Sequence, residues 1–111
     1  MTRPAMSYFS LYDYLLVHNT WSARTFGTDR KPLSIIRHLR KECDELEAAP
    51  TDLTEWIDVM ILAFDGACVA GYTPSQVLFA LQHKQSVNFG RTWPTPGDPN
   101  EPTEHIKEKQ S

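Results

Sequence analysis

The sequence is short of cysteine, of positive charge and of long apolar runs. Its two cysteines, Cys43 and Cys68, are expected on apolar helix faces as reduced thiols rather than as a disulfide. A formal net charge of −3 means that the chain has no excess positive charge with which to bind nucleic acids or anionic membranes. No apolar run reaches the roughly 18–20 residues that span a bilayer, and the first residues lack a signal-peptide core. We therefore expect a cytoplasmic protein without nucleic-acid or membrane partners.

Positive charge is missing altogether from residues 52–71, DLTEWIDVMILAFDGACVAG, which contain no Lys or Arg. Apolar residues recur there at helical spacing and nearly all round the circumference, which predicts a buried helix. The same helix carries Glu55, Asp58 and Asp65. Buried carboxylates without a partner are costly, so a cation must come from elsewhere. We expect chiefly a divalent metal and, as an alternative partner for Asp65, Arg91 or Lys84.

Capping and periodicity predict four helices and no convincing strand. Ser10 caps a first helix that runs to about Ala23, and later helices cover about residues 32–48, 52–71 and 74–89. After Trp93 the chain is rich in proline and charge, which indicates an extended or partly disordered tail. The expected organisation is an all-α domain over residues 1–93 and a tail over residues 94–111. A helical chain this small often completes its core by homo-oligomerisation.

Two of these helices carry acidic pairs with a spacing of three residues. The pairs are Glu42 with Glu45 and Glu55 with Asp58, and about ten residues join them. An antiparallel helical hairpin would gather the four carboxylates, whose repulsion a hard divalent cation relieves. Taken alone, such pairs more often form a solvated face, and a capping box with Asp52 also explains Glu55.

Cationic and aromatic side chains offer a complement for a nucleotide. Lys84, Asn88 and Arg91 lie along one face of the last helix and suit phosphate contacts, although a solvated face explains them equally well. The indole of Trp21 suits stacking on a purine, or it closes the first helix against the core. His38, one turn before Glu42, is better explained as a hydrogen-bonded histidine than as a ligand.

The sequence resembles a known superfamily, the MazG-like all-α nucleoside triphosphate pyrophosphohydrolases. Their signature, E-x-x-E followed by E-x-x-D, stands here as ECDE at 42–45 and EWID at 55–58. Further blocks in order, WSARTFG, KQSVNFGRTWP and EPTEHIK, are similar to the phage and prophage dATP/dGTP pyrophosphohydrolase group. The resemblance covers the chain from about Leu11 to Lys107.

The resemblance implies a helical bundle completed as a dimer or tetramer, which hydrolyses dATP or dGTP to the monophosphate with release of pyrophosphate. It implies Mg²⁺ or Mn²⁺, two or more ions per site, and a nucleotide-contacting run at Lys84, Asn88 and Arg91. The expected metal-binding and catalytic residues are Glu42, Glu45, Glu55 and Asp58. Some phage relatives, the MazZ-type enzymes, are specialised for (d)GTP and supply dGMP for 2-aminoadenine nucleotide synthesis, which gives an alternative function.

A function of another class also fits the residues alone. A non-catalytic helical interaction protein would keep the hairpin for assembly, with its carboxylates paired to Arg24, Lys84 and Arg91. A metal site should raise the melting temperature when metal is added, whereas an ion-paired structure should not respond.

Overall fold

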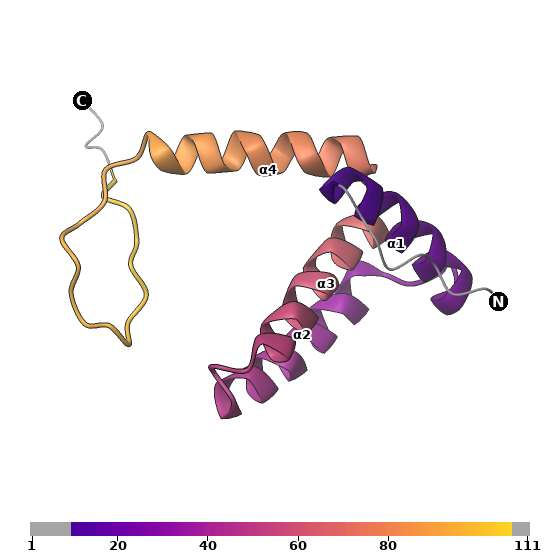
Figure 1. Ribbon diagram of the computed structural model, residues 1–111, viewed down its shortest axis with the longest axis horizontal. Helices are drawn as coiled ribbons and strands as arrows, with labels where there is room; N and C mark the ends of the chain where they lie inside the picture. Colours follow the sequence, from indigo (N-terminus) through magenta and orange to yellow (C-terminus); the bar gives the residue numbers. More distant parts are fainter. Residues whose placement is uncertain (1–9, 108–111) are drawn as a thin grey trace. The chain divides into compact units, whose positions relative to one another are not determined.

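The computed structural model describes residues 10–107 and contains four helices (Figure 1). They are α1 (Leu11–Phe26), α2 (Pro32–Ala48), α3 (Leu53–Val69) and α4 (Pro74–Phe89). Among the described residues, the β-structure is one isolated bridge between Thr92 and Ile106. The predicted all-α class is confirmed, and α1 is longer than predicted because it continues past Ala23 to Phe26. None of the helices in this part of the chain has the length and apolarity needed to cross a membrane.

The helices begin where their capping residues predict, whereas α1 ends later than predicted. Ser10 accepts a hydrogen bond from the backbone N–H of Asp13 at 3.1 Å, and α2 begins with Pro32. Thr73 and Gln76 form a reciprocal capping box at the start of α4. After α3, Gly71 has a φ of 102°, which a glycine adopts without strain and which ends the helix.

The predicted hairpin forms from α2 and α3, which lie side by side in Figure 1. A short turn joins them, closed by a hydrogen bond from the backbone N–H of Asp52 to the carbonyl of Ala49 at 3.0 Å. Gly66 allows close approach of the two helices, because a Cβ built there would lie 3.2 Å from Cγ2 of Ile35. The N-terminal helix α1 contacts α3, so one helix, α3, is common to both packing interfaces.

The chain divides into two compact units, residues up to 78 and residues from 79 onward. In the first unit the fully buried apolar side chains are those of Leu15 and Ile35. The prediction that the 52–71 helix is buried is wrong for a single chain, because apolar side chains of α3 remain open to solvent. Trp56 is 49% exposed and Met60 51% exposed. Two packing helices are too few to surround α3, so its apolar circumference exceeds the surface that α1 and α2 cover.

The second unit holds most of α4 and the segment that follows it. The predicted extended tail contains no further helix in its described part, and it returns on itself where Ile106 N donates to the carbonyl of Thr92 at 2.7 Å. Trp93 anchors the start of this loop, because its indole N–H donates to the carbonyl of Asn88 at 2.9 Å. The loop is visible in yellow in Figure 1.

Candidate active site

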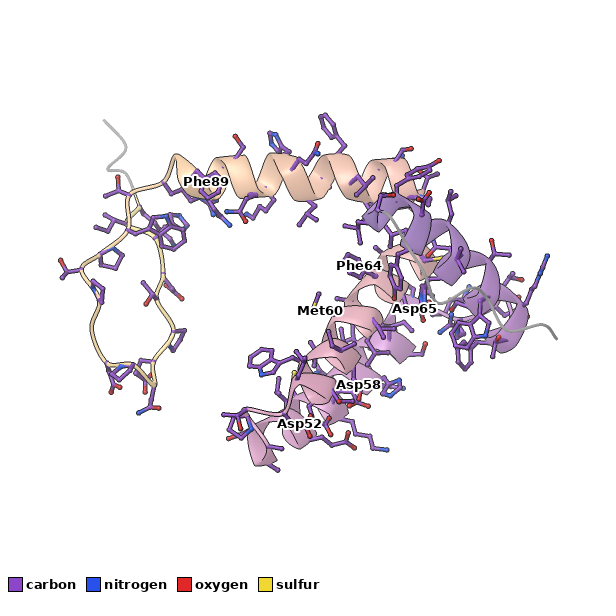
Figure 2. All side chains as sticks on the ribbon, viewed as in Figure 1. Asp52, Asp58, Met60, Phe64, Asp65 and Phe89 are labelled. Carbon is purple, nitrogen blue, oxygen red and sulfur yellow. The ribbon has the colours of Figure 1, made fainter. Side chains whose placement is uncertain are left out.

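Three of the four predicted carboxylates come together on the hairpin. Glu42 and Glu45 of α2 and Glu55 of α3 each offer one oxygen, and these oxygens all lie within 4.8 Å of one another. We call these three residues the carboxylate cluster. Figure 2 labels Asp52, the N-cap of α3, and Asp58, one turn beyond Glu55 on that helix.

The local sequence explains why Glu55 is available to the carboxylate cluster. Asp52 caps α3 by accepting a hydrogen bond from the backbone N–H of Thr54 at 2.9 Å. The predicted reciprocal bond from Glu55 to the backbone of Asp52 does not form, because the Asp52 N–H already donates to Ala49. The side chain of Glu55 therefore has no capping role and turns toward α2.

Burial and the closeness of the carboxylates raise two pKa values in the carboxylate cluster. Burial first, and then the charges of Glu45, Asp58, Glu42 and Asp52, raise the pKa of Glu55. The pKa of Glu45 is raised first by a hydrogen bond that its protonated form shares with Glu42, then by the charge of Glu42. When Glu42 and Glu45 are both ionised, their carboxylates can only accept hydrogen bonds, and they repel each other. A bound cation would relieve this repulsion.

Two oxygen atoms of the carboxylate cluster strengthen this conclusion. Among the described residues, Oε2 of Glu42 and Oε2 of Glu55 are buried without a hydrogen-bond partner. Leaving a buried acceptor unsatisfied is unfavourable, and more so if it is charged. The donor set is entirely carboxylate oxygen, which is the chemistry that Mg²⁺ and Mn²⁺ prefer. The residues present therefore fit the divalent metal predicted from the sequence.

His38 lies beside the carboxylate cluster as a hydrogen-bonding neighbour. Its Nε2 is 3.2 Å from Oε1 of Glu42, one helical turn along α2, and its side chain is 52% exposed. This contact holds one oxygen of Glu42 and leaves the other directed inward. The geometry agrees with the role predicted for His38, an orienting group rather than a ligand.

Asp58 does not join the closely spaced group. It is half-buried on α3, one turn beyond Glu55, and its charge contributes to the raised pKa of Glu55. Its role as a fourth metal ligand stays a prediction, with the three glutamates forming the part of the site that the hairpin assembles by itself.

The predicted nucleotide-contacting residues fall in both units. Trp21 is half-buried on α1, edge-on to Phe26 at 5.5 Å between ring centroids and tilted against His18 at 6.0 Å. In the second unit, Lys84 is exposed on α4, and Nη1 of Arg91 donates to Oδ1 of Asn88 at 3.0 Å. Trp21 and Arg91 are thus half-buried, and Lys84 is exposed.

Sequence reasoning missed a buried polar network around Asp65. Nη1 of Arg30 donates to Oδ2 of Asp65 at 2.7 Å, Ser22 donates to Oδ1 at 2.6 Å, and His18 lies 3.2 Å from Oδ1. The partner proposed from the sequence, Arg91 or Lys84, is therefore wrong. The usable signal was the recurrence of His18 and Ser22 one turn apart on an otherwise apolar face of α1, which indicated a polar group opposite.

This network connects three segments of the first unit. Asp65 belongs to α3, His18 and Ser22 to α1, and Arg30 to the loop between α1 and α2. Burial alone would raise the pKa of Asp65, but hydrogen bonds from Arg30 and Ser22 and the charge of Arg30 outweigh it and lower the pKa. Asp65 is thus a satisfied carboxylate that fastens α1 to the hairpin.

The fold is shared with an enzyme of known structure. The cyanophage S-2L MazG-like pyrophosphohydrolase, solved with dGDP and three catalytic Mn²⁺ ions per active site, is similar with a TM-score of 0.69 and 30% identity. The match covers 94% of this chain and all of that one. The helical fold of this chain and its acidic hairpin are therefore those of a MazG-like protein.

Sequence comparison identifies the family. The family model described as dATP/dGTP pyrophosphohydrolase matches residues 15–111, and the chain belongs to this family. The Eaa protein of Salmonella phage P22 is 39% identical over 92 residues, which cover 83% of this chain but only 28% of that protein. The family predicted from the sequence is confirmed.

Proposed function

We propose that this protein hydrolyses purine deoxynucleoside triphosphates, dATP or dGTP, to the monophosphate and pyrophosphate with Mg²⁺ or Mn²⁺. The observation that carries the proposal is the carboxylate cluster, three mutually repelling glutamates on adjacent helices with two buried oxygens that lack partners. A solvated acidic face would not bury these oxygens. Membership of a family described by dATP and dGTP supports the substrate class.

Glu42, Glu45 and Glu55 would hold the metal, with Asp58 as a further ligand. Bound divalent ions supply positive charge that neutralises the carboxylates and stabilises negative charge developing on the reacting phosphate. Two or more ions are in line with the three Mn²⁺ per active site of the S-2L enzyme. The number of oxygens in the carboxylate cluster is compatible with more than one ion.

The protein's own residues would bind and orient the substrate and move the proton. As the alternative to binding metal, Glu55, whose pKa is raised by burial and by its acidic neighbours, suits accepting a proton from the attacking water. Attack is proposed at the α-phosphorus, so that pyrophosphate leaves. Lys84 as a point charge and Arg91 as a planar fork suit the phosphates, and Asn88 suits sugar or base.

Purine recognition is proposed for Trp21. An indole ring stacks well on a purine, and Trp21 is held by His18 and Phe26 while remaining partly exposed. The S-2L enzyme was solved with dGDP, which favours guanine as one accepted base. A (d)GTP-specific enzyme that yields dGMP for synthesis of the 2-aminoadenine nucleotide is therefore the alternative within this class.

We also propose that the enzyme is a homo-oligomer, a dimer or a tetramer. A single chain leaves large apolar side chains open to water on α2, α3 and α4, including Leu33, Met60 and Phe79. Exposed apolar surface of this extent marks an interaction surface. The domain over residues 1–93 would supply the catalytic part and residues 94–111 a tail.

Substitution of the acidic residues tests the proposed function. Glu45→Gln and Asp58→Asn should each lower turnover of dATP and dGTP by roughly 100-fold or more, because even groups that only orient metal ligands cost 10–100-fold. Glu47→Gln, which removes an exposed charge on the same helix, is the control. Circular dichroism and light scattering should show unchanged helicity and size. Activity retained by both variants would overturn the assignment.

A further inference from the structure

A cavity lies within the second unit, among residues 90–107. It has a volume of about 320 Å³ and is lined by Gly90, Arg91, Thr92, His105, Ile106 and Lys107. We call it the tail pocket, because half of its lining comes from the last described residues. Ligand sites in proteins commonly begin at about 300 Å³, so the tail pocket has room for a small ligand.

Specific contacts bring the tail back to the end of α4. The bridge between Thr92 and Ile106 closes the loop, and the indole of Trp93 is fixed by its hydrogen bond to the carbonyl of Asn88. The imidazole of His105 meets that indole edge-on, with 6.0 Å between ring centroids. His105 and Lys107 are therefore placed beside Arg91 by packing and backbone pairing.

The described residues that line the tail pocket include two cations and a histidine, and none of them is acidic. Arg91 and Lys107 carry full positive charges, and His105 adds an imidazole that can donate a hydrogen bond. Within residues 10–107, the ion pairs involve His18, Arg30 and His38, so neither Arg91 nor Lys107 is neutralised by a described residue. Asn88 receives one N–H of Arg91, which orients the guanidinium and leaves its other donors for a ligand.

We propose that the tail pocket binds a phosphate chain of the size of pyrophosphate, with Lys107 and His105 acting together with Arg91. A guanidinium fork, an ammonium point charge and an N–H donor around one cavity match the several oxygens of a diphosphate group. The proposal deepens the proposed function, since it gives the tail a role in holding either the end of the substrate's triphosphate or the released product. Direct binding to the tail pocket does not require turnover.

Calorimetry with inorganic pyrophosphate tests the proposal on the full chain, in EDTA and at low salt. The wild-type protein should bind, and Lys107→Ala should weaken binding about tenfold, as expected for one charge-assisted hydrogen bond. Lys107→Arg should retain most of the affinity. Arg37→Ala, which removes a positive charge from the exposed surface of α2, is the matched control and should bind like wild type. Absence of wild-type binding, or equal binding by Lys107→Ala, would overturn the proposal.

Steady-state kinetics distinguish the two sources of the phosphate chain. A raised KM for the triphosphate in Lys107→Ala, at unchanged kcat, would show that the tail pocket holds substrate. Weaker inhibition of Lys107→Ala by pyrophosphate, at an unchanged KM for the triphosphate, would show that the tail pocket holds the product. Glu45→Gln separates this proposal from the proposed function, because it should abolish turnover and leave pyrophosphate binding in EDTA intact.

Discussion

At the scale of single residues, α3 carries two carboxylates, Asp65 and Glu55, whose surroundings differ. The helix has no cationic side chain of its own, yet it presents carboxylates at both ends. Asp65 is 4% exposed and receives hydrogen bonds from Arg30 and Ser22, and its pKa is lowered. Glu55 has a buried oxygen without a partner, and its pKa is raised. We infer that Asp65 stabilises the fold, and the proposed function makes Glu55 a ligand-binding residue.

Removal of the Asp65 carboxylate should destabilise the protein. Asp65→Ala should cost about 3 kcal/mol of unfolding free energy, because it leaves Arg30, Ser22 and His18 without their shared acceptor. Urea denaturation followed by circular dichroism measures the change. Asp44→Ala, which removes an exposed carboxylate from α2, should stay within about 0.5 kcal/mol of wild type. Equal stability of the Asp65 and Asp44 variants would contradict this role.

The same residue should make stability depend on acid. Because the pKa of Asp65 is lower in the folded chain than its ordinary value of 3.8, its contribution is complete above pH 3.8. That contribution is lost as the pH falls through the folded pKa. The groups that face Asp65 are His18, Ser22 and Arg30. Asp65→Asn should therefore reduce the loss of unfolding free energy below about pH 4. An unchanged acid limb in the variant would exclude Asp65 as its source.

Glu55→Gln should have opposite effects with and without metal. In EDTA the variant should melt at a higher temperature than wild type, because one of the mutually repelling charges is removed. With Mn²⁺ the wild type should gain stability through mass action, by about 2.7 kcal/mol at 100 times Kd, and the variant should gain less. Differential scanning fluorimetry gives both comparisons. A metal response as large in Glu55→Gln as in wild type would remove Glu55 from the site.

At the scale of elements, the sequence predicted the hairpin and its carboxylates well. Local signals such as Pro32, the Thr73–Gln76 box and Gly71 determine where helices begin and end, and these signals act over a few residues. The acidic pairs share faces by helical periodicity alone, so their meeting across a short turn followed directly. Glu42, Glu45 and Glu55 could therefore be assigned before the fold was known.

The contacts of the loop residues could not be predicted in the same way. Arg30 lies in an irregular segment between α1 and α2, where no periodicity indicates the direction of a side chain. It reaches Asp65, a residue 35 positions away, and it also lies 4.8 Å from the ring centroid of Phe26. The tail likewise has no repeating pattern, and its return to Thr92 depends on one backbone bridge. Such long-range contacts depend on tertiary packing.

At the scale of the whole molecule, the small core points to assembly. Cys43 is exposed rather than in a core, and both cysteines are free, as predicted.

Ile57, Met60 and Ile61 leave a partly exposed apolar surface along α3. Partner subunits would bury this surface, which is the reason for proposing a homo-oligomer.

Disruption of that surface should change the oligomeric state. Met60→Lys places a charge in the centre of the exposed apolar side of α3 and should shift the protein toward monomer. Size-exclusion chromatography with light scattering measures the change, and Ala48→Lys at the exposed end of α2 is the control. A wild-type protein that is monomeric at micromolar concentration would contradict the proposed oligomer.

The most direct test of the central claim is a turnover panel. The purified protein is given all eight common ribonucleoside and deoxyribonucleoside triphosphates with Mg²⁺, and then with EDTA, and the products are separated by ion-exchange chromatography. The account predicts metal-dependent dAMP or dGMP together with pyrophosphate. Inorganic phosphate in place of pyrophosphate would contradict attack at the α-phosphorus. No turnover of any nucleotide by folded, metal-loaded protein would contradict the enzyme itself.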